Sequence, residues 1–201
     1  MTRLLLMRHA ATAANLQRPY TLQGSRPDSP LAPEGVAQAA AVGRALAHLD
    51  IQEVYASPLI RARATAEALG RPVELEAGLI EVDVGEWAGL TWDDVARRWP
   101  AEHAAFEADA VASGYLGGEN LEQVRRRVLP VIEGLAERHP GATLLVVSHG
   151  VVNRVLLAHW MGLPLRCARS LPQDNTGYNV IDFHGGKAKV RTVNRVDHLV
   201  A

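Results

Sequence analysis

Cysteine is almost absent from this sequence, because its 201 residues include only Cys167. A single thiol excludes an internal disulfide framework and any metal site built from several cysteines. An excess of one charge is absent too, since 21 basic and 22 acidic side chains leave a net charge of −1. Without a global basic field, we expect neither nucleic acid nor an anionic membrane as a partner. Any anion site must therefore be built locally, from a few placed arginines.

Long apolar runs are also lacking. None approaches the ~18 residues of a membrane span. The run that starts at Leu4 stops at Met7, short of the roughly 7–15 residues in the core of a signal peptide. We therefore expect a cytoplasmic protein. The length fits one domain, residues 1–201, that buries a substantial core. We find no internal repeat, low-complexity tract or linker.

Short apolar runs alternate with amphipathic helical stretches along the chain. Strands are predicted at 4–7, 53–56, 73–75, 142–147, 178–183 and 188–193, the last two joined by a hairpin at Gly185-Gly186. Helices are predicted from Pro33 to Leu49 with Val36 on the apolar face, over 92–107 with a break at Pro100, from Leu121 with a kink at Pro130, and after Gly150. This alternation predicts an α/β fold, a three-layer sandwich with a mostly parallel central sheet flanked by helices.

Polar side chains stand where three of these strands end. The endings are Arg8-His9, Ser57 leading to Arg61, and Ser148-His149. Ser57 is the expected N-cap of the next helix, which places Arg61 about one turn into it. If the strands are parallel neighbours, their ends converge at one edge of the sheet. Two arginines and two histidines there would form a cationic pocket suited to a phosphate.

Histidine beside a phosphate has a specific chemical use. A neutral imidazole nitrogen can attack phosphorus and form a phosphohistidine that water later hydrolyses, while the arginines stabilise the oxygens. The leaving alkoxide needs a general acid. The segment 81–86 supplies three carboxylates, Glu81, Asp83 and Glu86, and spacing alone does not separate the first two.

A metal site from His9, His149 and Glu81 is the strongest competing chemistry. The flanking arginines argue against it, because buried cations would repel a divalent ion. The segment Gly185-Gly186-Lys187 lacks the spacing of a Walker loop, and no Gly-x-Ser-x-Gly elbow is present.

These motifs, in this order, resemble the histidine phosphatase superfamily, which includes the cofactor-dependent phosphoglycerate mutases. The resemblance covers nearly the whole chain. It departs from the family's opening signature, Arg-His-Gly-Glu-Thr, at Ala10 and Ala11. The matching segments are Arg8-His9-Ala10-Ala11-Thr12, Ser57-Pro58-Leu59-Ile60-Arg61-Ala62, Leu79-Ile80-Glu81 with Gly85-Glu86-Trp87-Ala88-Gly89, Gly117-Gly118-Glu119-Asn120 and Val147-Ser148-His149-Gly150.

The resemblance implies a phosphoglycerate mutase-like fold and a site without metal or cofactor. It makes His9 the nucleophile, Glu81 the proton donor, and Arg8, Arg61 and His149 the phosphate ligands. Further substrate-binding residues would be Asn15, Gln23, Gly24, Ser57 and Asn175.

The implied activity is that of a broad-specificity histidine phosphatase acting on a small phosphorylated metabolite. A phosphoglycerate mutase is the alternative, although Val82, Asp83 and Val84 stand where mutases of the family begin to place substrate-binding side chains. A non-catalytic phosphate-binding protein ranks lower, because none of the four central residues has been lost. The oligomeric state is left open, and a homodimer is compatible with the sequence.

Three expectations concern neighbouring residues. Ala10 raises the question of a positive φ, which would strain alanine, whereas Ala11 removes a surface or supporting carboxylate with little effect on the chemistry. Arg63 points about 200° around the helix from Arg61, so only one of the two faces the site. The run Arg125-Arg126-Arg127 is most simply a solvated helix face.

Overall fold

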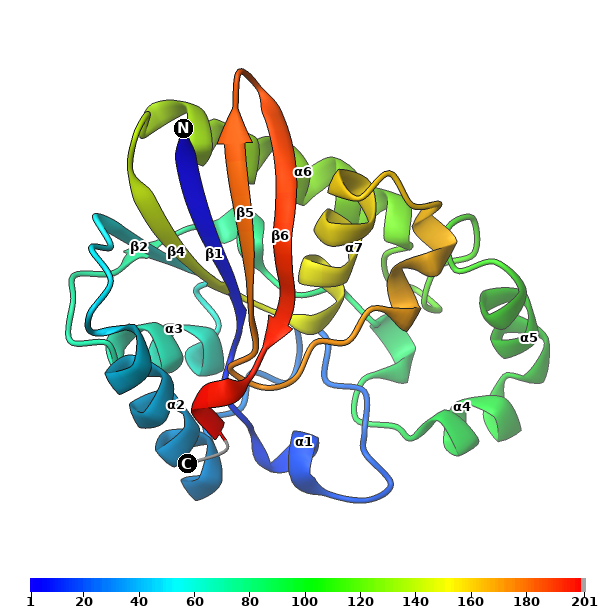
Figure 1. Ribbon diagram of the computed structural model, residues 1–201. Coiled ribbons are helices and arrows are strands. Elements are labelled where there is room, and N and C mark those ends of the chain that lie inside the picture. The colour runs from blue at the N-terminus through cyan, green and yellow to red at the C-terminus, as the bar shows by residue number, and fades with distance from the viewer. Residues whose placement is uncertain (200–201) are drawn as a thin grey trace.

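A six-stranded mixed sheet forms the centre of the molecule, in the order β3-β2-β4-β1-β5-β6 (Figure 1). The computed structural model describes residues 1–199. Neighbours from β3 to β1 run parallel, while β5 is antiparallel to both β1 and β6. The strands are β1 (Thr2–Arg8), β2 (Glu53–Ala56), β3 (Glu74–Leu75), β4 (Thr143–Ser148), β5 (Tyr178–His184) and β6 (Lys187–Arg195).

Helices lie on both sides of this sheet (Figure 1). They are α1 (Ala13–Leu16), α2 (Pro33–Leu46), α3 (Ile60–Glu67), α4 (Trp92–Arg98), α5 (Pro100–Ala108), α6 (Leu121–Arg138) and α7 (Gly150–Trp160). Short 3₁₀ helices span Ala77–Leu79, Gly85–Trp87, Leu165–Ser170 and Asp197–Leu199. None of the helices in residues 1–199 is long and apolar enough to cross a membrane.

Alternate residues of the central strands supply the two halves of the core. Leu4 and Leu6 of β1 join a cluster with α6 and α7, whereas Leu5 and Met7 join a second cluster with α2 and α3. This division follows from the two-residue period of a strand. It explains why β1 reads as a continuous apolar run, since both of its faces are covered by helices.

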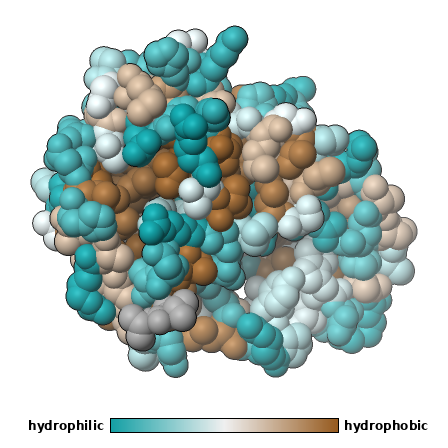
Figure 2. All heavy atoms as spheres, viewed as in Figure 1, coloured by the Kyte–Doolittle hydropathy of each residue, from teal (hydrophilic) through white to brown (hydrophobic). Residues whose placement is uncertain are grey.

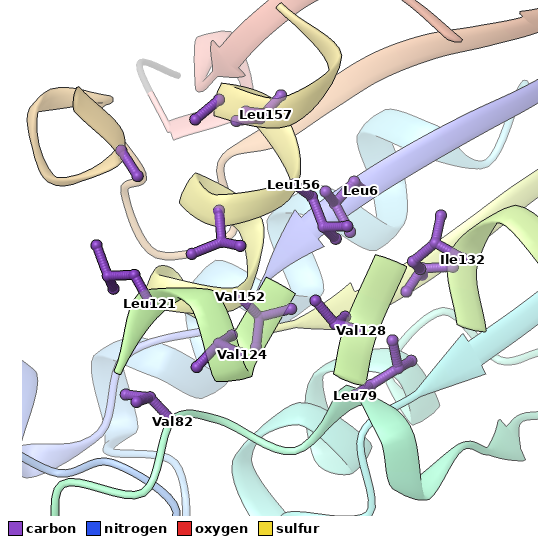
Figure 3. Packing of buried hydrophobic residues seen from close by; sticks show 14 of the residues in the cluster. Leu6, Leu79, Val82, Leu121, Val124, Val128, Ile132, Val152, Leu156 and Leu157 are labelled. Atoms are coloured by element: carbon purple, nitrogen blue, oxygen red, sulfur yellow. The ribbon is translucent and has the colours of Figure 1, made fainter. Parts of the chain in front are cut away.

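The larger cluster is built on helical spacing. Val124, Val128 and Ile132 recur every four residues along α6 and face Leu156 of α7 and Leu6 of β1 (Figure 3). All five side chains are essentially inaccessible to solvent. On the outer surface, Figure 2 shows hydrophobic atoms gathered in the middle of the face seen in Figure 1 and hydrophilic atoms around its margin.

The predicted α/β class and the flanked, mostly parallel sheet are confirmed, and one detail is wrong. Val36 was expected on the apolar face of α2, but it is 57% exposed. The buried face is centred on Gly35, Ala39 and Val42, and Val36 lies about 100° around the helix from Gly35. The helix α6 contains Pro130 and continues to Arg138.

Candidate active site

The predicted convergence of strand ends is present in the structure. Arg8 is paired with Ser148 in the register of β1 and β4, and Ala56 of β2 is paired with Val147. The residues that follow these pairs therefore meet at one edge of the sheet. A cavity of about 140 Å³ opens there, and its walls include Arg8, His9, Asn15, Gln23, Gly24, Arg61 and Glu81.

The imidazole of His9 is fixed in one tautomer by its neighbours. Its Nδ1 lies 2.7 Å from the carbonyl oxygen of Ala10, which can only accept, so Nδ1 carries the hydrogen. Nε2 is left with its lone pair, toward which Arg61 Nε donates over 3.3 Å. Burial lowers the pKa of His9 well below its usual value, and the charges of Arg8 and Arg61 act in the same direction. The ring is therefore neutral and nucleophilic near pH 7.

Arg61 is almost fully buried and is held by main-chain and side-chain oxygens. Its Nη2 donates to the carbonyl of Gly24 over 2.6 Å, and Nη1 lies 3.5 Å from Asp28 Oδ1. Burial lowers the pKa of Arg61, whereas Glu81 and Asp28 oppose that shift. Among residues 1–199, the buried guanidinium thus has only one contact with a carboxylate, and that contact is long.

The start of α3 differs from the prediction. The helix begins at Ile60, so Arg61 is its second residue, and Ser57 is not the N-cap. The Asp28 carboxylate accepts from the Ile60 N–H at 2.9 and 3.0 Å and takes over that role. A side chain from a distant loop can satisfy a helix terminus as well as a local one. Ser57 is fully buried, and its Oγ accepts weakly from the Leu59 N–H at 3.4 Å.

Arg8 approaches the cavity from the end of β1. Its Nη1 donates to the carbonyl of Gln173 over 2.7 Å, while its buried Nε has no hydrogen-bond partner within the described residues. Burial, followed by repulsion from Arg154, lowers the pKa of Arg8 to about 10. The guanidinium remains charged at neutral pH and has donors to spare for an anion.

His149 is completely buried behind the cavity, with its ring centre 5.2 Å from that of His9. Neither of its ring nitrogens has a hydrogen-bond partner among residues 1–199. Burial lowers the pKa of His149 well below its usual value, and His9 and Arg61 add to the effect. A buried imidazole with two unmet polar atoms is costly. An oxyanion bound in the cavity would offer it an acceptor.

Glu81 is held at the N-terminus of α7. Its Oε1 accepts from the N–H groups of Val82 and Val152 at 3.0 and 3.3 Å, and its Oε2 accepts from Val151 at 3.1 Å. The carboxylate lines the cavity and is only 8% exposed. These three N–H groups hold the carboxyl group in a fixed position at the wall of the cavity.

Asp83 and Glu86, the other two carboxylates of the segment 81–86, do not line this cavity. Asp83 Oδ1 accepts from the Gly85 N–H at 3.0 Å, and its Oδ2 lies 3.4 Å from Arg26. Glu86 is exposed. The competing metal site lacks geometric support too, since no three carboxylate, histidine or cysteine side chains of residues 1–199 are arranged to hold a metal ion.

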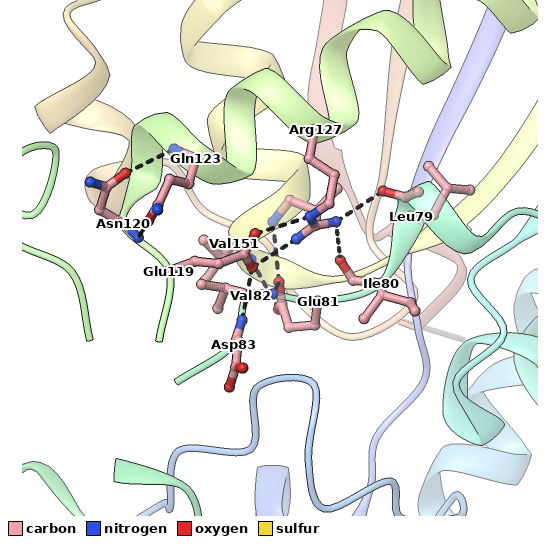
Figure 4. Close-up of polar contacts among 12 residues, drawn as sticks. Leu79, Ile80, Glu81, Val82, Asp83, Glu119, Asn120, Gln123, Arg127 and Val151 are labelled. Carbon is pink, nitrogen blue, oxygen red and sulfur yellow. Dashed lines mark hydrogen bonds and ion pairs between the residues drawn. The ribbon is translucent and has the colours of Figure 1, made fainter. Parts of the chain in front are cut away.

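The segment before Glu81 is anchored by Arg127, which makes one part of the solvated-face prediction wrong. Arg127 donates two hydrogen bonds to the carboxylate of Glu119 and two more to the carbonyls of Gly78 and Ile80, all between 2.8 and 3.0 Å (Figure 4). Arg125 and Arg126 do lie on the surface side and pair with Glu122. Helical spacing does not reveal a contact made to a distant loop.

Asn15, Gln23 and Asn175 form a polar rim around the cavity. Thr12 Oγ1 donates toward the side-chain oxygens of Asn15 and Gln23 at 3.1 and 3.2 Å. Asn175 Nδ2 donates to the carbonyl of His9 at 2.9 Å and lines an adjoining cavity of about 510 Å³. The Nε2 of Gln23 has no partner in the part of the chain that the structure describes, so it has a hydrogen bond to offer a ligand.

Gly24 lines one side of the cavity. Its φ is +53°, and a Cβ at this position would lie 2.7 Å from Val84 Cγ2. Both the positive φ and the close approach require glycine. The predicted residues Ser57, His149 and Asn175 do not line the 140 Å³ cavity itself, and sequence reasoning missed Asp28, Arg127 and Arg154.

The description “Histidine phosphatase superfamily (branch 1)” belongs to a family model that matches residues 4–196. The chain belongs to this superfamily. It is 31% identical to “Phosphoserine phosphatase 1” of Hydrogenobacter thermophilus over 203 residues, covering 99% of this chain and 95% of the relative. It is 29% identical to “Probable phosphoglycerate mutase GpmB” of Salmonella paratyphi A over 210 residues, covering 100% and 96%.

The fold agrees with this assignment. The solved structure of Bacillus stearothermophilus YhfR superposes with a TM-score of 0.91 at 32% sequence identity, covering 99% of this chain and 100% of that one. The sequence match and the structural match therefore both extend over nearly the whole chain.

The structure explains both departures from the histidine phosphatase opening motif. Ala10 does not have a positive φ, so alanine is unstrained there, and its N–H donates to Thr65 Oγ1 over 2.9 Å. Ala11 is fully buried, so of the two expectations for position 11, a surface or a supporting carboxylate, the first is wrong. Its carbonyl lies against Gly35 of α2, where a Cβ would approach it to 2.0 Å, so this contact requires glycine at position 35.

Proposed function

We propose that this protein is a phosphomonoesterase that hydrolyses small phosphorylated metabolites through a phosphohistidine on His9. The tautomer of His9 is the observation that carries the proposal. Its Nδ1–H is committed to the Ala10 carbonyl, and its Nε2 lone pair lies beside the Arg61 guanidinium in a cationic cavity. The phosphatase name of the Hydrogenobacter relative supports the same activity.

Substrate binding frees the nucleophile in this mechanism. In the ligand-free site, Arg61 Nε donates to His9 Nε2. A phosphoryl oxygen is a stronger acceptor for that N–H, so its arrival releases the Nε2 lone pair. Arg8, with its unpartnered Nε, and His149, whose neutral ring has one N–H without a partner, supply further donors to the phosphoryl oxygens.

Two displacements at phosphorus complete the reaction. In the first, Nε2 forms a bond to phosphorus while the ester P–O bond breaks, and Glu81 transfers its proton to the leaving oxygen. In the second, Glu81 takes a proton from water, whose oxygen bonds to phosphorus as the P–N bond breaks. Microscopic reversibility lets one carboxyl serve as acid and then as base.

Hydrolysis is favoured over mutase activity by the segment after Glu81. Val82 and Val84 are buried in the core, and Asp83 binds the Gly85 N–H. These side chains offer no cation to a second substrate anion. The name of the Salmonella relative keeps the mutase as the second candidate. Formation of 2-phosphoglycerate from 3-phosphoglycerate, with little free phosphate, would favour it.

The first test is turnover of p-nitrophenyl phosphate and 3-phosphoglycerate in the presence of EDTA. We expect release of inorganic phosphate from both, and a loss of about 10³-fold or more in the variant His9→Ala. His48→Ala is the matched control, because His48 is exposed. Activity abolished by EDTA and restored by zinc, or near-normal turnover by His9→Ala, would refute the mechanism.

A further inference from the structure

Arg154 lies at the junction of three cavities. It lines the 140 Å³ catalytic cavity, the adjoining 510 Å³ cavity bounded by Gln173 and Asn175, and a third cavity of about 250 Å³ whose walls include Trp92 and Tyr115. Because Arg154 faces all three, a substrate that extends out of the catalytic cavity in either direction passes this side chain.

The guanidinium of Arg154 is only partly satisfied by the protein. Its Nε donates to the carbonyl of Leu171 over 2.8 Å. Across the described residues, neither Nη atom has a hydrogen-bond partner and no carboxylate lies within 4 Å. Arg169 on the same third cavity is different, because it is paired with Glu107 at 2.6 Å and lies over the ring of Phe106. Of these two arginines, Arg154 is therefore the one with unfilled donors.

Arg154 and Arg8 are held close together. The Nη1 of Arg154 and the Nε of Arg8 both lie 3.6 Å from the point that a Cβ on Gly150 would occupy. Repulsion from Arg154 is the main cause, after burial, of the lowered pKa of Arg8. Glu81 and Asp174 act on the pKa of Arg8 in the opposite direction, but they do not outweigh burial and Arg154. Two like charges held this close favour a ligand with more negative charge than one phosphoryl group.

We propose that Arg154 binds a second oxyanion, a carboxylate or phosphate on the leaving group, while Arg8 and Arg61 bind the transferred phosphoryl group. The preferred substrates are then phosphomonoesters of acidic metabolites. Their carbon skeleton lies between the catalytic cavity and the aromatic wall of Trp92 and Tyr115. This assignment of substrate class rests on the proposed phosphatase activity.

Matched substrates test this assignment. O-phosphoserine differs from O-phosphoethanolamine by one added carboxylate, and 3-phosphoglycerate has a carboxylate in place of the hydroxymethyl group of glycerol 3-phosphate. Fructose 1,6-bisphosphate against fructose 6-phosphate tests a second phosphate. We expect the wild type to prefer the more acidic member of a pair by about 10- to 100-fold in kcat/KM, the range of a charge-assisted hydrogen bond. The pair with the larger preference identifies the oxyanion.

The variant Arg154→Gln should remove most of that preference, lowering kcat/KM for the acidic member about 10-fold or more and for its partner about threefold. Arg63→Gln is the control, because it removes the same charge from an exposed ion pair with Glu67, and it should leave both values unchanged. Inhibition by inorganic phosphate should weaken less than threefold in Arg154→Gln.

Two results would overturn the assignment. Equal losses on all substrates, with weaker inhibition by inorganic phosphate, would place Arg154 on the transferred phosphoryl group. An unchanged preference would remove it from substrate recognition. Binding to His9→Ala, measured by calorimetry with O-phosphoserine and O-phosphoethanolamine, separates this question from hydrolysis. The contribution of Arg154 to binding is then measured even if the phosphohistidine mechanism fails.

Discussion

Arg127 and Arg61, two arginines near Glu81, differ in how far the protein itself satisfies their guanidinium groups. The guanidinium of Arg127 donates two hydrogen bonds to the carboxylate of Glu119 and two more to main-chain carbonyls. Arg61 is more deeply buried, because its side chain is 1% exposed and that of Arg127 is 29% exposed. Within residues 1–199, however, its one carboxylate contact is the 3.5 Å approach to Asp28, which also caps α3. The first arginine is matched within the protein, and the second is left for a ligand.

This difference separates structural from functional cations. Burying a charge without a close counter-ion costs stability that packing alone does not return. A protein that retains such a residue gains from it elsewhere, and in the proposed mechanism the gain is binding of a phosphoryl group. A buried arginine without a close counter-ion, such as Arg61, therefore points to the site more directly than the presence of arginine alone. Substituting each member of this pair should have opposite consequences.

The largest effect is expected from Arg61→Met. Removing the guanidinium takes away a phosphoryl ligand and should lower kcat/KM for p-nitrophenyl phosphate about 10³-fold. The free energy of unfolding should fall by less than about 1 kcal/mol, since an unmatched buried charge is lost with it. Steady-state kinetics and urea unfolding measure the two quantities. Retained activity together with a large loss of stability would make Arg61 a structural residue like Arg127.

Glu81→Gln tests the acid held between the two arginines. We expect a loss of about 100-fold or more on glycerol 2-phosphate, whose alkoxide needs a proton, and a much smaller loss on p-nitrophenyl phosphate. The ratio of the two rates is the measurement, and Asp83→Asn serves as the control outside the cavity. Equal losses on both substrates would move the acid role to another carboxylate.

Arg127→Met should show the reverse of Arg61→Met. It leaves Glu119 and the carbonyls of Gly78 and Ile80 without their donor, so the free energy of unfolding should fall by about 2–3 kcal/mol. Turnover by the folded protein should change about 10-fold at most. Arg126→Met, on the exposed side of the same helix, should change stability by less than about 0.5 kcal/mol. Similar free energies of unfolding for both variants would mean that Arg127 is not a structural residue.

The smallest effect is a dependence of stability on pH. Burial lowers the folded-state pKa of His9 and His149, and less strongly that of His198. The unfolded chain therefore takes up protons near pH 6.5 that the folded protein does not bind. The free energy of unfolding should fall as the pH drops below about 6.5, by up to about 1.4 kcal/mol per pH unit for each fully depressed histidine.

His149→Gln should reduce that slope. Urea unfolding between pH 7 and 5.5 measures it, above the range in which most carboxylates titrate. A slope that is the same in wild type and variant would mean that His149 takes up a proton within the fold.

The pattern of apolar and polar residues along the chain predicted the site residues that lie near the ends of strands and helices. Arg8, His9, Arg61 and Glu81 line one cavity because apolar strands and helices hold their neighbours in the core. The α/β class followed from the same alternation of strands and helices. The start of α3 could not be predicted, since its cap is Asp28, 32 residues from Ile60 in the sequence.

Arg127 and Arg154 could not be assigned for the same reason. One reaches the carbonyls of Gly78 and Ile80, and the other lies beside Arg8 at the end of a different element. Helical periodicity does not predict either of these contacts, because it indicates only which face of a helix is buried. Long-range polar contacts depend on tertiary packing, and so they needed the structure.

The central claim is that His9 carries the phosphoryl group on Nε2. Rapid mixing with substrate, alkaline quenching and ³¹P NMR of the trapped protein, with mass spectrometry of its peptides, identify the phosphorylated atom. We predict Nε2-phosphohistidine at His9 and none in His9→Ala, because Nδ1–H is bound to the Ala10 carbonyl. A phosphoryl group on Nδ1 or on another residue, or hydrolysis that continues in His9→Ala, would contradict this mechanism.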